Sequence, residues 1–264
     1  MTGFTKAHAC GNDFLIVEGK ADPALAIKLC ARNTGVGADG VEFFEWMSER
    51  AGRIRLVNAD GSVAEISGNG TRCVAAWMAY QKRLEAGDAV KIETDAGTRE
   101  CRVVKAEGNR FEFAQGMGVP VLREKRVMLE DGTEVEGVAV SVGNPHFVIF
   151  AGDQTFATHG RDWQEVGREI CFHSDYPGET NVEFVRVVDT NSIEIRIFER
   201  GVGPTTSSGT GTCATATAAI SRRGLNPHLV VRAPGGEQWV DWAGDGAEIM
   251  LTGPAELIAS GEAW

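Results

Sequence analysis

Two short segments of this 264-residue chain combine serine, glycine and threonine in the same order. Residues 67–71 read Ser-Gly-Asn-Gly-Thr, and residues 208–212 read Ser-Gly-Thr-Gly-Thr. In each, strand-like sequence gives way to a helical pattern. Unpaired backbone N–H groups and the positive end of a helix dipole therefore meet at glycines, which let a ligand approach closely. The simpler interpretation is that Ser67 and Ser208 are ordinary helix N-caps. Taken as a pair, the segments predict one site for a small anionic substrate.

An internal repeat relates the two segments. They lie 141 residues apart, as do residues 40–43, Gly-Val-Glu-Phe, and residues 181–184, Asn-Val-Glu-Phe. Asn58 and Glu199 have the same separation, and a looser Gly-Asn match has an offset of 132 residues. Several matches in the same chain order indicate a duplication with pseudo-twofold symmetry.

The elements that position these segments are typical of an α+β fold. We expect a first domain over residues 1–120, completed by the tail 252–264, and a second over residues 121–251. Frequent runs rich in Val, Ile and Phe predict largely antiparallel sheets, with hairpin turns at 108–109, 131–132 and 245–246. Helices are expected from Pro23 to about Asn33 and over 68–81, 163–171 and 209–223, the last ending at Gly224.

The composition excludes several classes of protein. A net charge of −11 argues against nucleic acid and anionic membranes as partners, because both require a basic surface. Neither a run of 18 apolar residues nor a signal-like N-terminus occurs, so a cytoplasmic location is expected. The six cysteines lack metal-binding spacing, which predicts buried reduced thiols and no metal. Residues 35–40 spell G-x-G-x-x-G, but a helix precedes them and a strand follows, the reverse of a dinucleotide-binding motif.

Longer motifs resemble those of the diaminopimelate epimerase family nearly from end to end. They include residues 8–14, 35–39, 58–62, 68–73, 143–146, 181–182, 199–201, 209–211 and 252–255. The resemblance implies a homodimer whose domains are each a curved sheet or barrel around a central helix. It also implies cofactor-independent epimerisation of LL- and meso-diaminopimelate, a small zwitterionic amino acid of lysine and peptidoglycan precursor synthesis.

The same resemblance assigns roles to individual residues. In the family, two cysteines act on opposite faces of the substrate α-carbon, one as thiolate base and one as thiol acid; these positions are Ser67 and Ser208 here. His146 and Glu199 are implied to tune the two catalytic groups, the alternative for His146 being a structural role after the Asn-Pro turn. Substrate contacts are implied for Asn12, Asn58, Gly68, Asn69, Asn144, Asn181, Glu199, Arg200, Gly209 and Thr210.

Serine at both catalytic positions changes the chemistry. A thiol has a pKa of about 8.5 and a hydroxyl is closer to water, at about 15.7, so proton removal costs roughly 10 kcal/mol more. Helix dipoles and one histidine typically recover only a few kcal/mol of this difference. Cys73 and Cys213 match other family positions, further along each helix, and do not replace the missing pair.

Three explanations of the serines stay open: an engineered trap, a natural variant that is slow or acts on a more acidic C–H bond, and a ligand-binding protein without turnover. Gly40 and Pro204 replace the Gln and Glu common in relatives, and Ser207 adjoins Ser208, which favours a natural variant. A further alternative is an isomerase that uses carboxylates on the same fold. Glu65 and Asp60 are its candidates near the first segment.

Overall fold

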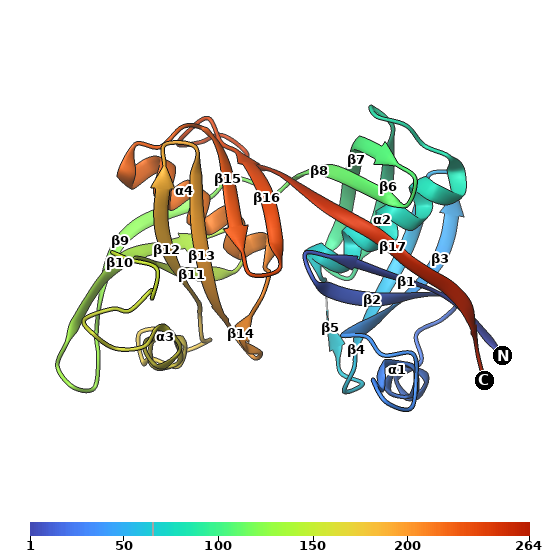
Figure 1. The fold of residues 1–264 in the computed structure, drawn as a ribbon, viewed down its shortest axis with the longest axis horizontal. Coiled ribbons are helices and arrows are strands. Elements are labelled where there is room, and N and C mark those ends of the chain that lie inside the picture. Colours follow the sequence, from blue (N-terminus) through green and yellow to red (C-terminus); the bar gives the residue numbers. More distant parts are fainter. Residues whose placement is uncertain (65) are drawn as a thin grey trace. The chain divides into compact units, whose positions relative to one another are not determined.

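The chain forms two compact units in a computed structural model, which describes residues 1–64 and 66–264. Unit 1 comprises Met1–Gln115 and Thr252–Trp264, and unit 2 comprises Gly116–Leu251. Within each unit, strands curve around one long helix, and a second helix is shorter (Figure 1). This architecture confirms the predicted α+β class with largely antiparallel sheets around a central helix.

Unit 1 wraps its strands around α2. Its helices are α1 (Pro23–Cys30) and α2 (Gly68–Lys82). Its strands are β1 (Thr2–Ala9), β2 (Asn12–Glu18), β3 (Gly40–Ser48), β4 (Ala51–Asn58), β5 (Val63–Ala64), β6 (Ala89–Thr94), β7 (Gly97–Glu107), β8 (Arg110–Gly116) and most of β17 (Met250–Ala263). β2 pairs with β3, and β4 with β6, in parallel. The buried middle of α2 joins the largest apolar core of the unit, with Phe14, Phe44 and Leu56 from the strands.

Unit 2 repeats this plan around α4. Its helices are α3 (Trp163–Cys171) and α4 (Gly209–Arg223). Its strands are β9 (Val121–Met128), β10 (Glu134–Ser141), β11 (Pro145–Phe150), β12 (Asn181–Asp189), β13 (Ser192–Glu199), β14 (Gly203–Thr205), β15 (His228–Ala233) and β16 (Gly236–Asp241). The parallel pairs are β11 with β12 and β13 with β15, at the same places in the element order as in unit 1.

The register of the strands extends the repeat to single residues. Phe14 lies beside Gly40 on the parallel strands of unit 1, and His146 lies beside Asn181 on those of unit 2. Gly40 and Asn181 are themselves related by the 141-residue offset. The position that holds Phe14 in unit 1 therefore holds His146 in unit 2.

Most helix boundaries follow the predictions. α3 and α4 have the predicted bounds, and α2 ends one residue later than predicted. α4 is closed by Gly224 in the left-handed conformation, with φ at 66°. The prediction for α1 was wrong at its end: the helix stops at Cys30 because the backbone N–H groups of Val36 and Gly37 both turn back to the Leu29 carbonyl.

The C-terminal strand, β17, connects distant parts of the sequence. It begins at Met250 and continues to Ala263 as the longest strand of the chain. Its partners are β1 and β8, which precede it by more than a hundred residues. This pairing explains how a C-terminal segment belongs to unit 1.

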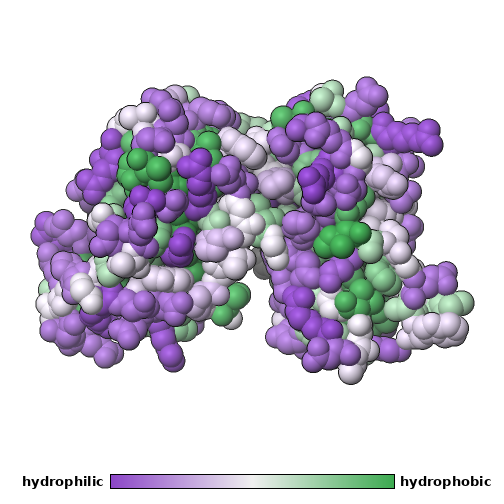
Figure 2. All heavy atoms as spheres, viewed as in Figure 1, coloured by the Kyte–Doolittle hydropathy of each residue, from purple (hydrophilic) through white to green (hydrophobic). Residues whose placement is uncertain are grey.

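The surface and the cysteines agree with the composition. Hydrophilic residues dominate the face drawn in Figure 2. All six cysteines are buried, as predicted, and within the described chain none forms a disulfide bond. In the same residues, no helix has the length and apolar character needed to cross a membrane.

Candidate functional site

The first cap site is built on the N-terminus of α2 and comprises Ser67, Gly68, Asn69, Gly70 and Asn12. Ser67 has extended backbone angles, and its Oγ accepts a hydrogen bond from the Gly70 N–H at 3.1 Å. Gly68 opens onto free space, because a Cβ atom built there would meet nothing within 4 Å among the described residues outside its own turn. The first turn of α2 therefore presents backbone N–H groups on a side that a ligand can reach.

Amide side chains surround this cap. The Asn69 amide donates to Asn12 Oδ1 at 3.2 Å, and the Asn12 amide donates to Asp39 Oδ2 at 2.6 Å. Asp39 is in turn held by Arg32, whose Nη2 lies 2.7 Å from the carboxylate. Asn58, at the end of β4, instead donates to Ser62 Oγ at 3.0 Å. The structure thus joins Asn12 and Asn69 at the cap, whereas Asn58 bonds within its own turn.

The second cap site is built on the N-terminus of α4 and comprises Ser208, Thr210, Gly211, Asn144 and His146. Ser208 Oγ accepts from the Gly211 N–H at 3.2 Å, as Ser67 does from Gly70. The Asn144 amide donates to Thr210 Oγ1 at 3.4 Å, and its Oδ1 lies 3.0 Å from His146 Nε2. Asn144 and Thr210 therefore correspond to Asn12 and Asn69 of the first cap site.

His146 is almost fully buried and is bonded at both ring nitrogens. Its Nδ1 lies 2.7 Å from Glu183 Oε1, and both side chains have no exposed surface. The two contacts fix the orientation of the ring between the Glu183 carboxylate and the Asn144 amide oxygen. The charges of this pair act on Glu199, the other residue predicted to tune the catalytic groups. Burial first, and then repulsion from Glu183, raise the pKa of Glu199 to about 7, while His146 opposes the rise.

The remaining predicted contacts flank the second cap site. Asn181 lies beside His146 on the adjacent strand, and its amide donates to the Pro145 carbonyl at 3.2 Å. Its Oδ1 accepts from the Arg200 backbone N–H at 2.9 Å. The Arg200 side chain is exposed and donates to the Gly178 carbonyl at 3.1 Å. Gly209 is buried at the first position of α4.

Sequence reasoning missed two acids that lie behind the caps. Glu42 on β3 and Glu183 on β12 are fully buried and lie 141 residues apart. A side chain at Gly70 would overlap the Glu42 carboxyl, and one at Gly211 would lie 2.8 Å from Glu183 Oε1. The second glycine of each segment therefore makes room for an acid. The repeat included both glutamates, and their place in otherwise apolar strands was the available signal.

The structure describes only one of the two alternative carboxylates. Glu65 lies outside the described residues. Asp60 is exposed and accepts hydrogen bonds from the Ser62 backbone at 2.8 Å and the Ser62 hydroxyl at 2.6 Å. These bonds lower the pKa of Asp60, which keeps the carboxyl ionised in its own turn. Among the described residues, no group of three or more His, Cys, Asp or Glu side chains is arranged to hold a metal ion.

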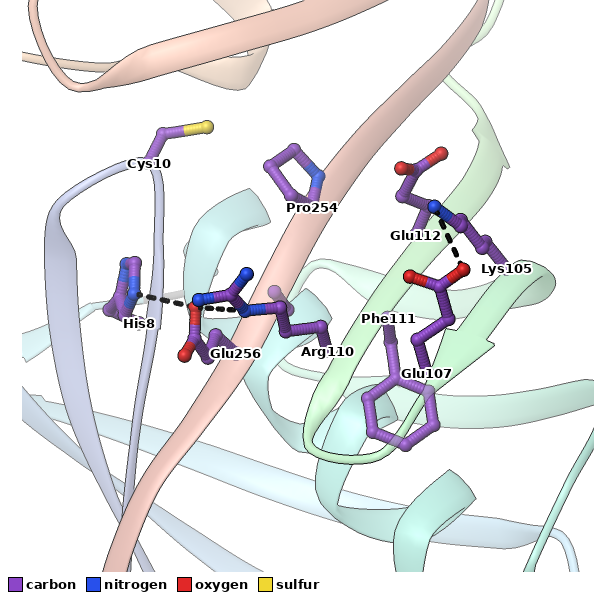
Figure 3. A pocket seen from close by; sticks show the side chains of 10 residues that line it. His8, Cys10, Lys105, Glu107, Arg110, Phe111, Glu112, Pro254 and Glu256 are labelled. Atoms are coloured by element: carbon purple, nitrogen blue, oxygen red, sulfur yellow. Dashed lines mark hydrogen bonds and ion pairs between the residues drawn. The ribbon is translucent and has the colours of Figure 1, made fainter.

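A cavity of about 280 Å³ lies elsewhere in unit 1, at the end of β1 and along β17 (Figure 3). Glu256 lies between Arg110 and His8, 3.1 Å from Arg110 Nε and 3.9 Å from His8 Nε2. Lys105 and Glu107 pair at 3.1 Å on its rim. Four of its charged side chains are thus held in ion pairs, and its lining shares no residue with the first cap site, although Cys10 lies two residues before Asn12.

Comparison with known proteins places these features in a family. A family model described as "Diaminopimelate epimerase" matches residues 4–122 and 138–258. A diaminopimelate epimerase of Desulforudis audaxviator is 36% identical, and one of Pelotomaculum thermopropionicum is 34% identical; each match covers 98% of both chains. The solved structure of a Bacillus anthracis protein of the phenazine biosynthesis PhzF family has the same fold, with a TM-score of 0.72 at 17% identity, over 100% of this chain and 99% of that one.

Proposed function

Since this chain belongs to the diaminopimelate epimerase family, and is therefore an isomerase, we propose that it interconverts LL- and meso-diaminopimelate without a cofactor. The observation that carries this proposal is the repeated cap: two helix N-termini, each with a serine hydroxyl and an asparagine side chain at its first turn. Inversion at one carbon needs one proton-transfer group for each face, and the duplication supplies two.

Each cap residue has a separate role in the proposed reaction. The N–H groups at Gly68, Asn69, Gly209 and Thr210 hold the α-carboxylate of the substrate. One serine accepts the α-proton, the electron pair stays on the α-carbon and is delocalised into the bound carboxylate, and the other serine delivers a proton to the opposite face. Asn12, Asn58, Asn144, Asn181, Glu199 and Arg200 complete the substrate contacts, and His146 tunes the second serine.

Proton exchange at the α-carbon tests the proposal. Purified protein incubated with LL-diaminopimelate in deuterated water is expected to incorporate deuterium at Cα and to form the meso isomer, measured by mass spectrometry and chiral chromatography. The double variant Ser67→Ala/Ser208→Ala should abolish both, whereas Ser221→Ala, at the exposed far end of α4, should retain them. If calorimetry shows saturable binding of diaminopimelate and no deuterium is exchanged, the proposed epimerase activity is wrong and the chain is a binding protein.

Two further features belong to this proposal. The family resemblance favours a homodimer, which sedimentation of the purified chain measures. A cytoplasmic location fits a small amino-acid substrate made inside the cell.

A further inference from the structure

Glu42 is a buried acid for which the fold supplies no partner. Its side chain has no exposed surface, and neither carboxyl oxygen has a hydrogen-bond partner among residues 1–64 and 66–264. A polar group buried without a partner destabilises the folded state, and it does so far more when it is charged. Because this burial destabilises unit 1, we looked for a function that Glu42 performs there.

The Glu42 carboxyl lies against the turn that Ser67 caps. A carbon added at Gly70 would lie 3.0 Å from Glu42 Cδ and 3.3 Å from Ser67 Cβ, so the two side chains flank one point. The Ser67 hydroxyl accepts from the Gly70 N–H, which leaves its own proton to donate. Only glycine at position 70 permits this arrangement.

In unit 2 the glutamate that corresponds to Glu42 is Glu183, and it has a hydrogen-bond partner. Glu183 flanks Gly211 and Ser208 in the same way, with Ser208 Oγ 3.3 Å from the corresponding point. There, His146 binds the carboxylate at 2.7 Å. In unit 1 the position of His146 is taken by Phe14, which can neither donate nor accept a proton. Among the described residues, Glu42 is thus the acid that lies against Gly70 of the first cap site, without the histidine that accompanies its counterpart Glu183.

We propose that Glu42 is a positioning residue that exchanges a proton with the Ser67 hydroxyl, so that Ser67 can act on the substrate. This inference rests on the proposed function. When Ser67 Oγ takes the α-proton, the substrate C–H bond breaks and its electron pair stays on the α-carbon. The hydroxyl's own proton passes to the Glu42 carboxylate, and a rotation about the terminal bonds of Glu42 brings the oxygens together. Each transfer is reversed when Ser67 protonates the α-carbon.

The surroundings of Glu42 suit this exchange. Burial raises the pKa of Glu42 to about 8, so the carboxyl exists in both forms near neutral pH. Cys73 of α2 is an ionisable neighbour of Glu42, and Arg72, Cys10 and Asp13 are the other charged or ionisable groups that act on Cys73. Burial raises the pKa of Cys73, which stays a thiol. Arg72 donates to Asn69 and the Pro254 carbonyl, and Asp13 is paired with Lys6 at 3.0 Å and Arg32 at 2.9 Å.

A thiol placed at position 67 reports on this coupling without any turnover. We would make Ser67→Cys alone and with Glu42→Gln, and measure the rate of alkylation by iodoacetamide from pH 6 to 10. The native chain, with its six buried cysteines, provides the background. With Glu42 present, its negative form should raise the apparent pKa of the new thiol by about one unit relative to the Glu42→Gln background. Ser208→Cys should show no difference between the same two backgrounds.

The outcomes are distinct. Identical alkylation profiles for Ser67→Cys in both backgrounds would overturn the coupling, whatever the enzyme does with diaminopimelate. A coupled profile, with a native chain that exchanges no deuterium, would uphold the coupling and reject the proposed function. If the native chain does exchange deuterium, Glu42→Gln should lower that rate by about 10²-fold with little change in KM, since the general acid–base contribution is lost. An unchanged rate would overturn the proton exchange.

Discussion

The N-termini of α2 and α4 share one backbone design and differ in the chemistry behind it. Both have a serine cap in extended conformation, a glycine at the third helical position, an amide side chain at the first turn, and a buried glutamate. In the first cap site Glu42 has no hydrogen-bond partner among the described residues, whereas in the second Glu183 is bonded to His146.

This difference fits the two-face reaction proposed above. A duplication supplies two equal binding cradles, but epimerisation needs one group that takes a proton while the other gives one. In the second cap site, Asn144 and Glu183 are hydrogen-bonded to the two ring nitrogens of His146. In the first cap site, burial raises the pKa of the Glu42 carboxyl to about 8, and no histidine lies beside it at the corresponding position, which is Phe14. The backbone of the two caps is thus the same in both halves, whereas the ionisable side chains behind them differ.

Restoring sulfur at both caps should produce the largest effect. The double variant Ser67→Cys/Ser208→Cys is expected to raise deuterium exchange into diaminopimelate by at least about 10⁴-fold, because each thiol gives an acid–base group of suitable pKa. The single variants show which face limits the native chain. Ser207→Cys, one residue away, serves as the control that should not gain activity. A double variant no faster than the native chain would mean that the pocket is not built for this substrate.

Removing the charge of Glu42 should change how stability depends on pH. A carboxyl with a pKa of about 8 in the folded chain and about 4.5 when unfolded binds more protons in the native state between these values, so its stabilising contribution is lost as pH rises. From pH 5 to 8 this loss amounts to about 4 kcal/mol, at about 1.36 kcal/mol per unit. Glu42→Gln should remove that slope from urea denaturation curves. The same slope in both proteins would show that Glu42 is ionised in the native state.

Making the second cap site resemble the first should cost slightly less. His146→Phe introduces the residue type of position 14 and leaves Glu183 buried without its donor. We expect a loss of about 3 kcal/mol in the free energy of unfolding, since the variant leaves the Glu183 carboxylate buried without the group that compensates its charge. His228→Phe, which breaks an exposed pair with Asp241, should cost less than about 1 kcal/mol. Equal losses would contradict the special place of His146.

The parts of the fold that were predicted correctly depend on local signals. Ser208 and Gly224 define both ends of α4 by their own backbone preferences, so the sequence near each end was sufficient. The end of α1 depended on a turn that returns two N–H groups to Leu29, for which no residue type is diagnostic. β17 could not be predicted as one strand, because its pairing with β1 joins residues about 250 positions apart.

The site divides along the same line. Each cap was visible in a five-residue pattern, and the structure places Asn12 and Asn144 beside the caps as hydrogen-bond partners of Asn69 and Thr210. The bond between His146 and Glu183 spans 37 residues and depends on the register of two parallel strands. Glu42 is harder still to predict, since it stands out by having no hydrogen-bond partner among the described residues, and a sequence pattern does not show this.

The smallest expected effect tests whether the two caps are equal as structural elements. Ser67→Ala and Ser208→Ala each remove one acceptor for the N–H of the third helical residue, at nearly equal distances of 3.1 and 3.2 Å. Each should lower the local stability of its helix by about 1 kcal/mol, measured by hydrogen–deuterium exchange of α2 and α4 peptides. Asp162→Ala, at the cap of α3, calibrates an ordinary cap. Suppose that Ser67→Ala leaves the stability of α2 unchanged while Asp162→Ala lowers that of α3 by the usual amount. The buried Glu42 carboxyl then already destabilises the first turn of α2, and Ser67 serves the reaction and not the stability of the helix.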